Sequence, residues 1–535
     1  MCRSRPSLLR DMGLAVAPTG VAQPARWPVV AVATALWVVA TLQFGLRDSL
    51  TSNELDTLLT ARRWLEPEFL AGDWFLGLDQ GPRRPFQVVL APLVWALPLH
   101  VASVVGRLAG YAALAWALAR LLARLGIGPA LAVVLGGLYV RWDQSIAGGE
   151  WLLGTVESKV GAYALVLFGL DAWIAGRRGT AAALFGAATT LHVLVGGQAT
   201  LAMALAGLWA ARGDPRPWRH WLGLAAGWLV AASPAVVLLA RAAAQQLPTG
   251  DGPDMAWIYV VFRTPHHSDP RTWTIGWRTW AVGLAMLAAL ALAPGRLADR
   301  PAARTLGAFG VAALLPFAAG IVAAQLPGGH RFLQLLPFRV GGAMLPLIGL
   351  VLCGALWVRF APALPRVWLP RALAAWVLVQ AALPLPGYLQ VWRDFPMGGR
   401  PALPREAGLD LQKAAHWVAA HGPPQAAVLC SPALESVGWL AQRPVVASYK
   451  QVPPGRAEVV AWYHRIVDLA GGVQPTARGN PMLAELDARF ETLPLDHYRA
   501  LGRRHGARTL LVRRADLPLP VLYANAHWRV YGLIL

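Results

Sequence analysis

Two carboxylates stand directly after the first long apolar run of the sequence. They are Glu54 and Asp56, in the stretch SNELDTLLTARRWL that begins at Ser52. A carboxylate in such a position can act as a general base or can bind a cation. Residues two positions apart on a helix point to nearly opposite sides, so only one of the two would face a given ligand. The alternative is a solvated loop helix that Glu54 merely caps.

A second group of charges lies in the stretch 143–163, which reads DQSIAGGEWLLGTVESKVGAY. It contains Glu150, Glu157 and Lys159, and Lys159 is the only lysine before residue 413. A compact ammonium group suits a phosphate or a carboxylate partner. We therefore interpret these three residues as candidates for binding a phosphorylated substrate. The alternatives are a Glu157–Lys159 surface pair, or a lysine that extends its chain to the membrane surface.

The stretch FRTPHHSDP, residues 262–270, holds Arg263, His266 and His267 among its prolines. The prolines predict an extended or turned backbone rather than a helix. Arginine and histidine donate hydrogen bonds to anionic oxygen, so the stretch suits a phosphate. Two histidines can also bind a metal, but no acidic or cysteine partner stands at a recognisable spacing. The alternative is a polar surface loop.

The stretch GGHRFLQLLPFRVGG, residues 328–342, adds His330, Arg331 and Arg339. It falls on the side of the membrane that is predicted below to be extracytoplasmic, where arginines are rare. An anionic lipid head group or a pyrophosphate would explain them, and the alternative is pairing with the carboxylates named above. His192, one helical turn before a Gly–Gly pair that predicts a tight outer turn, is a further candidate. The alternative there is a histidine that packs through hydrogen bonds.

The elements that position these residues follow from the composition. The chain has 535 residues, of which 56% are hydrophobic and 14% charged, and its mean hydropathy is +0.45. Soluble domains carry about a quarter charged residues. The sequence therefore predicts an α-helical polytopic membrane protein with about eleven spans of about 20 apolar residues each. We place them at 27–46, 101–122, 127–142, 160–176, 179–195, 197–211, 221–242, 276–294, 304–324, 340–359 and 371–387.

The distribution of charge predicts the orientation. The first 26 residues and the short loops on the same side are rich in arginine, which predicts a cytoplasmic N-terminal tail at 1–26. All the charged stretches above then lie on the opposite side. So does the outer loop 47–100, whose broken apolar run 86–99 predicts a re-entrant or interfacial helix. The basic loops account for the net charge of +20, so nucleic acid is not an expected partner.

The pattern changes after the membrane domain, 27–390. Short apolar strands at 427–431, 444–448, 509–513 and 528–533 alternate with helices at 405–421, 435–441, 456–469 and 495–505, which predicts a small extracytoplasmic α/β domain over 391–535. The three cysteines show neither a disulfide framework nor a metal-ligand spacing. Lys450, Trp462 and Arg465 are candidates for a lid, although for Trp462 we favour a place in the core.

The order of these features resembles the GT-C glycosyltransferases. The shared features are acidic residues straight after the first helix, the run Arg62–Arg63, Leu65 and Gly72–Asp73–Trp74, and a many-helix core followed by an outer α/β domain. The sequence is similar in particular to uncharacterised bacterial membrane proteins with the DUF6798 domain. That similarity rests on ESKVGAY (157–163), RTPHHSDP (263–270), LLPFR (335–339), and Lys450, Trp462 and Arg465.

The resemblance implies a reaction and a location. GT-C enzymes transfer a sugar from a polyprenyl-phosphate carrier to an acceptor on the outer face, which implies a multi-pass protein of the bacterial cytoplasmic membrane. In many of them an Asp–Glu pair in the first outer loop supplies the catalytic aspartate. Here that pair reads Asn53–Glu54, so the base would be Glu54 or Asp56.

The remaining candidates would bind the substrate and neutralise the departing phosphate. They are Glu150, Glu157, Lys159, His192, Arg263, His266, His267, His330, Arg331 and Arg339. A phosphate leaving group needs no acid, and whether a divalent cation takes part stays open. The alternative function is a non-catalytic binder or transporter of a lipid-linked saccharide or of an anionic lipid, and the asparagine at position 53 favours it.

Overall fold

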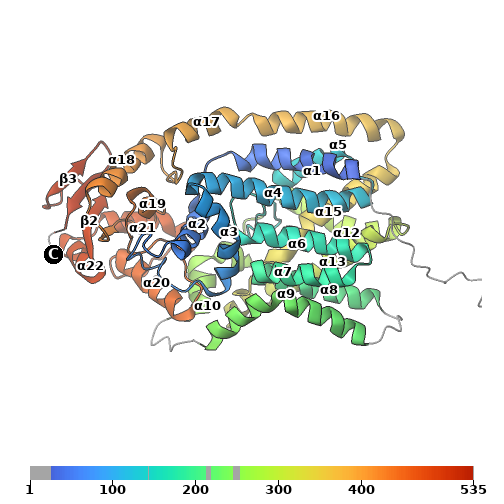
Figure 1. The fold of residues 1–535 in the computed structure, drawn as a ribbon, viewed down its shortest axis with the longest axis horizontal. Coiled ribbons are helices and arrows are strands. Elements are labelled where there is room, and N and C mark those ends of the chain that lie inside the picture. The colour runs from blue at the N-terminus through green and yellow to red at the C-terminus, as the bar shows by residue number, and fades with distance from the viewer. Residues whose placement is uncertain (1–25, 142–143, 212–217, 245–252, 534–535) are drawn as a thin grey trace, which may run out of the picture.

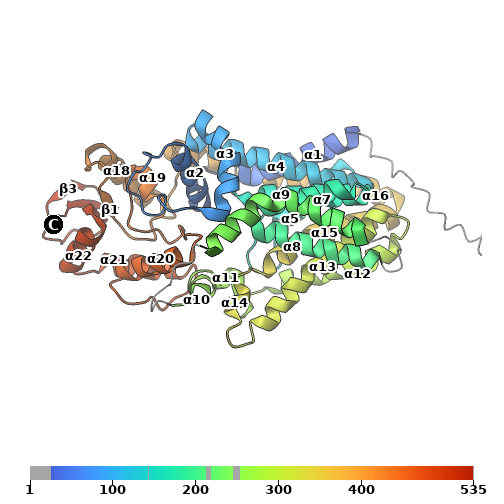
Figure 2. The same ribbon diagram turned by 60° about the horizontal axis from the view of Figure 1, so that its bottom comes forward.

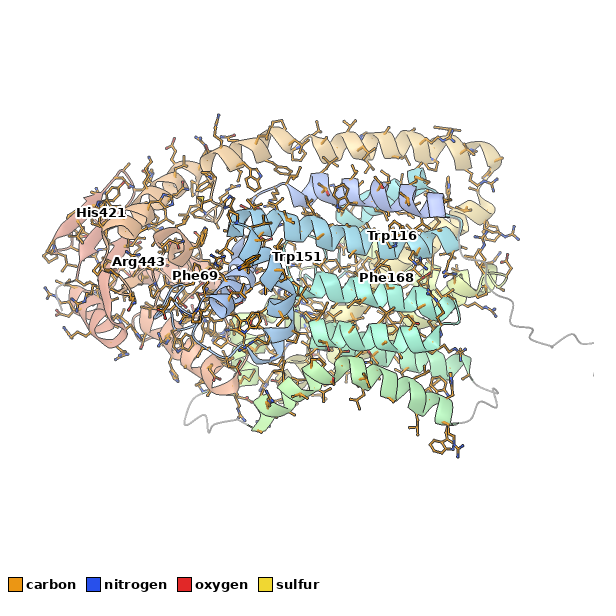
Figure 3. All side chains as sticks on the ribbon, viewed as in Figure 1. Phe69, Trp116, Trp151, Phe168, His421 and Arg443 are labelled. Atoms are coloured by element: carbon orange, nitrogen blue, oxygen red, sulfur yellow. The ribbon has the colours of Figure 1, made fainter. Side chains whose placement is uncertain are left out.

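The computed structural model describes residues 26–141, 144–211, 218–244 and 253–533, and it divides into a long helix bundle and a C-terminal part that covers one end of the bundle (Figure 1). The described chain begins in α1 within the bundle and ends in the C-terminal part (Figure 1). Figure 3 places Trp116 and Phe168 along the bundle and His421 at the opposite end of the molecule. We call the end of the bundle that meets the C-terminal part the capped end.

Each predicted span coincides with a helix of the bundle. Among the described residues, eight helices are long and apolar enough to cross a membrane. They are α1 (Arg26–Ala40, continued by η1, Thr41–Gly45), α4 (Leu99–Arg124), α8 (Val193–Ala210), α9 (Trp218–Ala244), α12 (Trp277–Arg296), α13 (Pro301–Ala323), α15 (Phe338–Phe360) and α16 (Ala363–Ala382) with its extension α17 (Leu385–Asp394). Three bundle helices are shorter: α5 (Pro129–Arg141), α6 (Ser158–Ile174) and α7 (Arg178–Leu191). The chain is a multi-pass membrane protein.

Some of the most exposed tryptophans lie at the two ends of the bundle. Trp95 and Trp277 are 76% and 75% exposed, and both lie at the capped end, just before α4 and at the start of α12. Trp209 and Trp218 are 67% and 66% exposed and lie at the other end, where α8 ends and α9 begins. Tryptophan concentrates at membrane–water interfaces because its ring is apolar and its N–H is polar. The capped end and the C-terminal part therefore project beyond the membrane on one side.

The connection between α7 and α8 differs from the prediction. The chain turns at His192, which has extended backbone angles (φ −148°, ψ 99°), and the glycine pair lies inside α8 rather than in the turn. The glycine is needed for packing instead: a Cβ at Gly196 would lie 2.1 Å from the backbone nitrogen of Thr189 on α7. His192 is thus the connection itself, and its side chain lies at the capped end.

Short helices fill the capped end between the bundle and the C-terminal part. They are α2 (Ser52–Leu65), η2 (Gly81–Arg83), α3 (Arg84–Ala96), α10 (Met255–Trp257), η3 (Ile258–Arg263), α11 (Pro265–Ser268), η4 (Pro270–Thr272) and α14 (His330–Leu333). Figure 2 shows α10 and α11 lying between the two parts. The prediction of a non-helical FRTPHHSDP stretch is wrong, because Pro265 occupies the first turn of α11, where its missing N–H costs no hydrogen bond.

The C-terminal part holds a four-stranded sheet and five helices. The strand order is β1 (Ala427–Leu429), β2 (Ala507–Val512), β4 (Arg529–Gly532), β3 (Val521–Ala524), with β1 and β2 parallel and the other pairs antiparallel. The helices are α18 (Arg405–His421), α19 (Val437–Ala441), α20 (Arg456–Leu469), α21 (Met482–Glu491) and α22 (Leu495–His505). The strand predicted at 444–448 is wrong, because only Val445 pairs with β1, as an isolated bridge. The sequence pattern did not predict α21 or β3.

The two parts share hydrophobic cores. One core joins Phe262 of η3 to Tyr449 and Trp462 of the C-terminal part, and a second joins Leu58 of α2 to Val428 of β1. Burial of such side chains contributes about 1.5–3 kcal/mol each. The C-terminal part is therefore packed firmly on the outer loop and on η3, and its segments can take fixed positions relative to the capped end.

Candidate functional site

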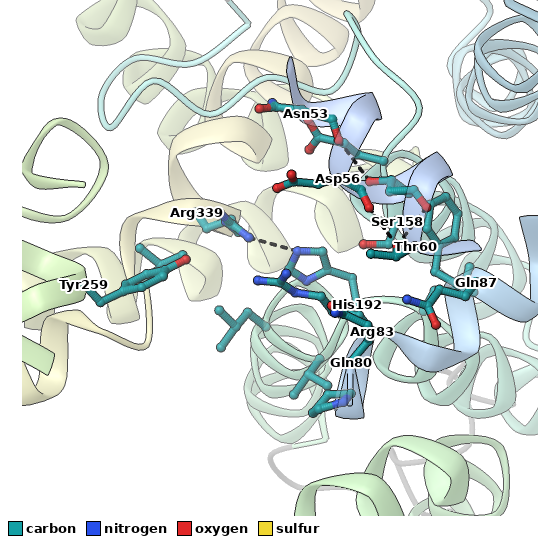
Figure 4. A pocket seen from close by; sticks show the side chains of 18 residues that line it. Asn53, Asp56, Thr60, Gln80, Arg83, Gln87, Ser158, His192, Tyr259 and Arg339 are labelled. Atoms are coloured by element: carbon teal, nitrogen blue, oxygen red, sulfur yellow. Dashed lines mark hydrogen bonds between the residues drawn. The ribbon is translucent and has the colours of Figure 1, made fainter. Parts of the chain in front are cut away.

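A polar cavity of about 410 Å³ opens at the capped end. Segments that are far apart in the sequence line it, namely α2, η2, α3, the start of α6, the α7–α8 connection, η3 and the start of α15. Figure 4 shows Asp56 projecting from α2 into a space that Arg83, His192 and Arg339 border. The ionisable and amide groups on its wall are Asn53, Asp56, Gln80, Arg83, Gln87, Glu157, His192, Tyr259 and Arg339.

Glu54 does not line this cavity, because its carboxylate is fully buried between α2 and α4. It forms an ion pair with the guanidinium of Arg107, whose side chain is equally buried. Ser103 Oγ and the Val156 backbone N–H donate hydrogen bonds to it at 2.9 and 2.8 Å. Glu54 also completes a capping box with Thr51 at the start of α2. Every side of this carboxylate is occupied, which suits a residue that holds α2 in place.

Asp56, on the opposite side of α2, faces the cavity. Its Oδ1 atom is buried and has no hydrogen-bond partner among the described residues. Burial raises the pKa of Asp56 to about 8, against the opposing effect of the Arg83 guanidinium. A carboxyl group whose pKa lies near neutral pH can accept a proton from a substrate and release it again. Of the two predicted bases, Asp56 is the one with the geometry of a base.

A buried chain of alternating charges lies beside the cavity, and its members Glu157 and Arg339 line the cavity wall. Arg339 Nε lies 3.3 Å from Glu150 Oε2, and Lys159 Nζ lies 3.9 Å from Glu150 Oε1 and 2.9 Å from Glu157 Oε2. Asn53 Nδ2 ends the chain by donating to Glu157 Oε1 at 2.7 Å. Burial alone would raise the pKa of Glu157, but the Lys159 ammonium, together with hydrogen bonds from Lys159, Thr155 and Asn53, lowers it to about 2. Glu157 is therefore an anion at all working pH values, and Lys159 is held by two carboxylates.

Arg339 connects this chain to the wall of the cavity. Its Nη1 donates to His192 Nε2 at 2.9 Å (Figure 4, dashed line). The structure thus brings together six of the residues that the sequence singled out. They are Asp56, Glu150, Glu157, Lys159, His192 and Arg339.

The FRTPHHSDP stretch lies beside this group and is occupied with packing. The guanidinium of Arg263 stacks 4.2 Å above the Tyr449 ring and Nε donates to the Tyr449 carbonyl at 3.0 Å. His267 Nδ1 makes a hydrogen bond with the Gly148 carbonyl, and the His266 ring lies against the His267 ring. Burial lowers the pKa of His266 to about 3 and of His267 to about 4, so both are neutral at pH 7. Neither histidine supplies positive charge to a phosphate.

His330 and Arg331 lie away from the cavity. Both face Asp254 at the surface, at 3.6 and 3.2 Å, and the Arg331 side chain is 77% exposed. The two arginines of this stretch therefore have different roles. Arg331 belongs to a surface pair, whereas Arg339 belongs to the buried chain.

Two functional candidates were missed by the sequence analysis. Arg83 lines the cavity, and its Nη2 donates to the Val452 carbonyl of the C-terminal part at 3.0 Å. The signal that would have found it is the Arg83–Arg84 pair in a predicted outer loop, which runs against the usual distribution of arginine. Arg107 was missed as the partner of Glu54. A charged residue inside a predicted span calls for such a partner.

The Gly72–Asp73–Trp74 run docks the outer loop on the C-terminal part. Asp73 Oδ2 accepts a hydrogen bond from the Val445 backbone N–H at 3.3 Å, and the Arg465 guanidinium lies 4.4 Å above the Trp74 ring. Trp462 is fully buried, as expected for core. Within the described ranges, no three His, Cys, Asp or Glu side chains come together in a way that could hold a metal ion.

Comparisons with known proteins agree with parts of this description. A family model described as "Domain of unknown function (DUF6798)" matches residues 410–469, so the resemblance to proteins with that domain is confirmed over this stretch, which includes Lys450. No curated protein matches the sequence. The motifs quoted from the membrane domain lie outside the matched residues.

Solved structures with a similar course of the chain include ArnT from Cupriavidus metallidurans in the apo state, with a TM-score of 0.47, 14% identity, and coverage of 95% of this chain and 98% of that one. ArnT from the same organism bound to undecaprenyl phosphate has a TM-score of 0.40 and 14% identity, with coverage of 95% of this chain and 97% of that one. The Archaeoglobus fulgidus oligosaccharyltransferase tethered with an acceptor peptide has a TM-score of 0.46 and 11% identity, with coverage of 91% of this chain and 69% of that one. These similarities concern the arrangement of the chain, and the function proposed next rests on the cavity itself.

Proposed function

We propose that this protein is a membrane glycosyltransferase that transfers a sugar from a polyprenyl-phosphate-linked donor to an acceptor at the extracytoplasmic face of the bacterial cytoplasmic membrane. The observation that carries the proposal is Asp56, a carboxylate with an unpartnered buried oxygen, in a cavity with Arg83 and Arg339 at the level where the bundle leaves the membrane. A lipid phosphate would lie at that level, and its isoprenoid chain would lie along the bundle.

The proposed reaction uses Asp56 as a general base. Its carboxylate removes the proton of the acceptor hydroxyl, whose oxygen attacks the anomeric carbon of the sugar. The bond between that carbon and the phosphate oxygen breaks, and its electron pair stays on the phosphate. Arg83 and Arg339 neutralise the charge that develops there, which is where preorganised donors lower a barrier most. Because the attack and the departure occur on opposite faces of the sugar, the configuration at this carbon inverts.

The buried chain from Arg339 to Asn53 positions these groups. Glu150 and Glu157 fix Arg339 and Lys159, and a phosphate above them meets donors that are already oriented. Glu54 does not act on the substrate in this proposal, because Arg107 occupies it. A divalent cation on the donor phosphate is compatible with the reaction, and assays with and without EDTA measure its contribution.

The test is sugar transfer by the purified full-length protein, using polyprenyl-phosphate-linked sugars and a broad acceptor panel. We expect turnover in the wild type and its loss in Asp56→Asn, while Asp79→Asn serves as the matched control because Asp79 pairs with Arg84 at the surface of the same loop. Wild-type turnover in Asp56→Asn would remove the proposed base. Tight binding of the lipid phosphate with no transfer to any acceptor would favour the alternative function, a non-catalytic binder or transporter.

A further inference from the structure

An irregular segment of the C-terminal part, residues 448–452, contacts the cavity wall through Arg83. Trp462 Nε1 donates to the carbonyl of Ser448 at 2.9 Å. Arg263 Nε donates to the Tyr449 carbonyl, and the Tyr449 hydroxyl donates back to the carbonyl of Arg263, both at 3.0 Å. Loops normally run over the surface with solvated backbone groups. Here Ser448 and Tyr449 are buried, and side chains from both parts of the molecule bind their backbone.

The other end of the segment is held by the cavity wall. Arg83 donates to the carbonyl of Val452, two residues after Lys450, and Arg83 itself lines the cavity. The backbone on both sides of Lys450 is therefore fixed, by Arg263 before it and by Arg83 after it. Both arginines belong to the part of the chain that precedes the C-terminal part, so the position of Lys450 is set relative to the cavity.

The Lys450 side chain is half-buried and lies within electrostatic range of the proposed base. Burial and the Arg263 guanidinium lower the pKa of its ammonium, whereas Glu435, Asp56 and Glu157 act in the opposite direction. Over the described residues, its ammonium forms no hydrogen bond or ion pair with the protein, unlike Lys159, which two carboxylates hold. A partly desolvated ammonium on a fixed backbone is a ready donor for an anion.

We propose that Lys450 binds the phosphate group of the anionic lipid, so that the C-terminal part completes an anion site with Arg83 and Arg339. The proposal rests on the proposed function, since it assigns a further residue to the phosphate end of the same cavity. It assigns to the C-terminal part a direct role in substrate binding. A free phosphate has the same chemistry as the lipid head group, and the experiment separates the two.

The experiment measures equilibrium binding to the full-length protein in nanodiscs, with a polyprenyl phosphate, the corresponding polyprenol and inorganic phosphate as three probes. We expect Lys450→Met to weaken binding of the polyprenyl phosphate by about 10-fold or more, the effect of losing one charge-assisted hydrogen bond. Binding of the polyprenol should stay unchanged, and Lys450→Arg should retain most of the affinity. Lys413→Met is the matched control, because Lys413 pairs with Asp410 on α18.

The outcomes are distinct. An affinity of Lys450→Met within 2-fold of the wild type would overturn the role of Lys450 while leaving the role of Asp56 standing. An equal loss of affinity for the polyprenol and the polyprenyl phosphate would also overturn it, because it would show a structural effect. If inorganic phosphate alone binds as tightly as the polyprenyl phosphate, the site is one for free phosphate. If the wild type does not distinguish polyprenyl phosphate from polyprenol, both proposals fail.

Discussion

The two faces of α2 carry one carboxylate each, and the two carboxylates have opposite environments. On the face toward α4, Glu54 is enclosed by Arg107, Ser103 and the Val156 N–H. On the face toward the cavity, Asp56 has an oxygen without a partner and a pKa raised by burial to about 8. A buried carboxylate whose oxygens all have hydrogen-bond or ion-pair partners stabilises the fold. A buried carboxylate without such partners destabilises the fold until a ligand supplies them. These environments suit a structural role for Glu54 and the proposed catalytic role for Asp56, within a single turn of helix.

The largest effect is expected from a substitution of Asp56, on the face of α2 toward the cavity. Asp56→Asn should lower kcat by about 10²–10⁴-fold, the usual contribution of a general base. The same change should raise the stability of the fold at high pH. Because the folded-state pKa of Asp56 lies above the unfolded value of about 4, wild-type stability falls as pH rises from about 4 to about 8. The melting temperatures of wild type and Asp56→Asn at pH 5 and pH 9 measure this, and equal differences at both would contradict the raised pKa.

The next largest effect is expected from a substitution of Glu54, on the face of α2 toward α4. Glu54→Ala leaves Arg107 buried without its partner, which costs about 3–5 kcal/mol. We expect a clear loss of thermal stability in Glu54→Ala. Replacing both partners, as Glu54→Leu with Arg107→Met, should restore a large part of it, because no charge is then left buried alone. If the double variant is as unstable as the single one, the burial of an unpaired charge is not the cause.

The pH dependence sharpens the assignment of Asp56. The carboxylate is the active form of a general base, so kcat/KM should rise about tenfold per pH unit below pH 8 and level off above it. Lys450→Met should move this midpoint upward, because the Lys450 ammonium lowers the pKa of Asp56. A profile that is flat between pH 6 and pH 9 would show that another group, or no base at all, limits the reaction.

A smaller effect tests the phosphate end of the cavity with two neighbouring arginines. Arg83→Gln should raise the KM for the donor by about 10–100-fold, since a charge-assisted contact contributes about 1.5–3 kcal/mol. Arg84→Gln should change KM less than about 2-fold, because Arg84 only pairs with Asp79 at the surface. Equal effects of the two variants would indicate a general electrostatic influence rather than a contact.

The smallest effect concerns Asn53, whose amide ends the buried chain at Glu157. Asn53→Asp replaces the donor to Glu157 by a second carboxylate at 2.7 Å from it, and like charges at this distance repel. We expect a loss of thermal stability of about 1 kcal/mol or more and no gain in activity. A gain in activity would mean that position 53, rather than Asp56, is the place of the base.

The sequence alone determined the class of the protein, the positions of its bundle helices and most of its C-terminal elements. Apolar runs of membrane-spanning length and a low charge content leave few other folds open, and each run became a bundle helix. α18, α20 and α22 have the bounds that their apolar patterns predict. The short segments were harder, because a proline can open a helix as well as prevent one, as Pro265 does in α11.

Only the tertiary structure decided which charges form the candidate site. Spacing showed that Glu54 and Asp56 face different ways, but the choice between them depends on Arg107, which lies on another helix. In the same way, Arg331 and Arg339 are equivalent in the sequence, and only the packing of α15 against the cavity separates them. The role of a buried charge is set by the partners around it, and those partners come from segments that the sequence does not place side by side.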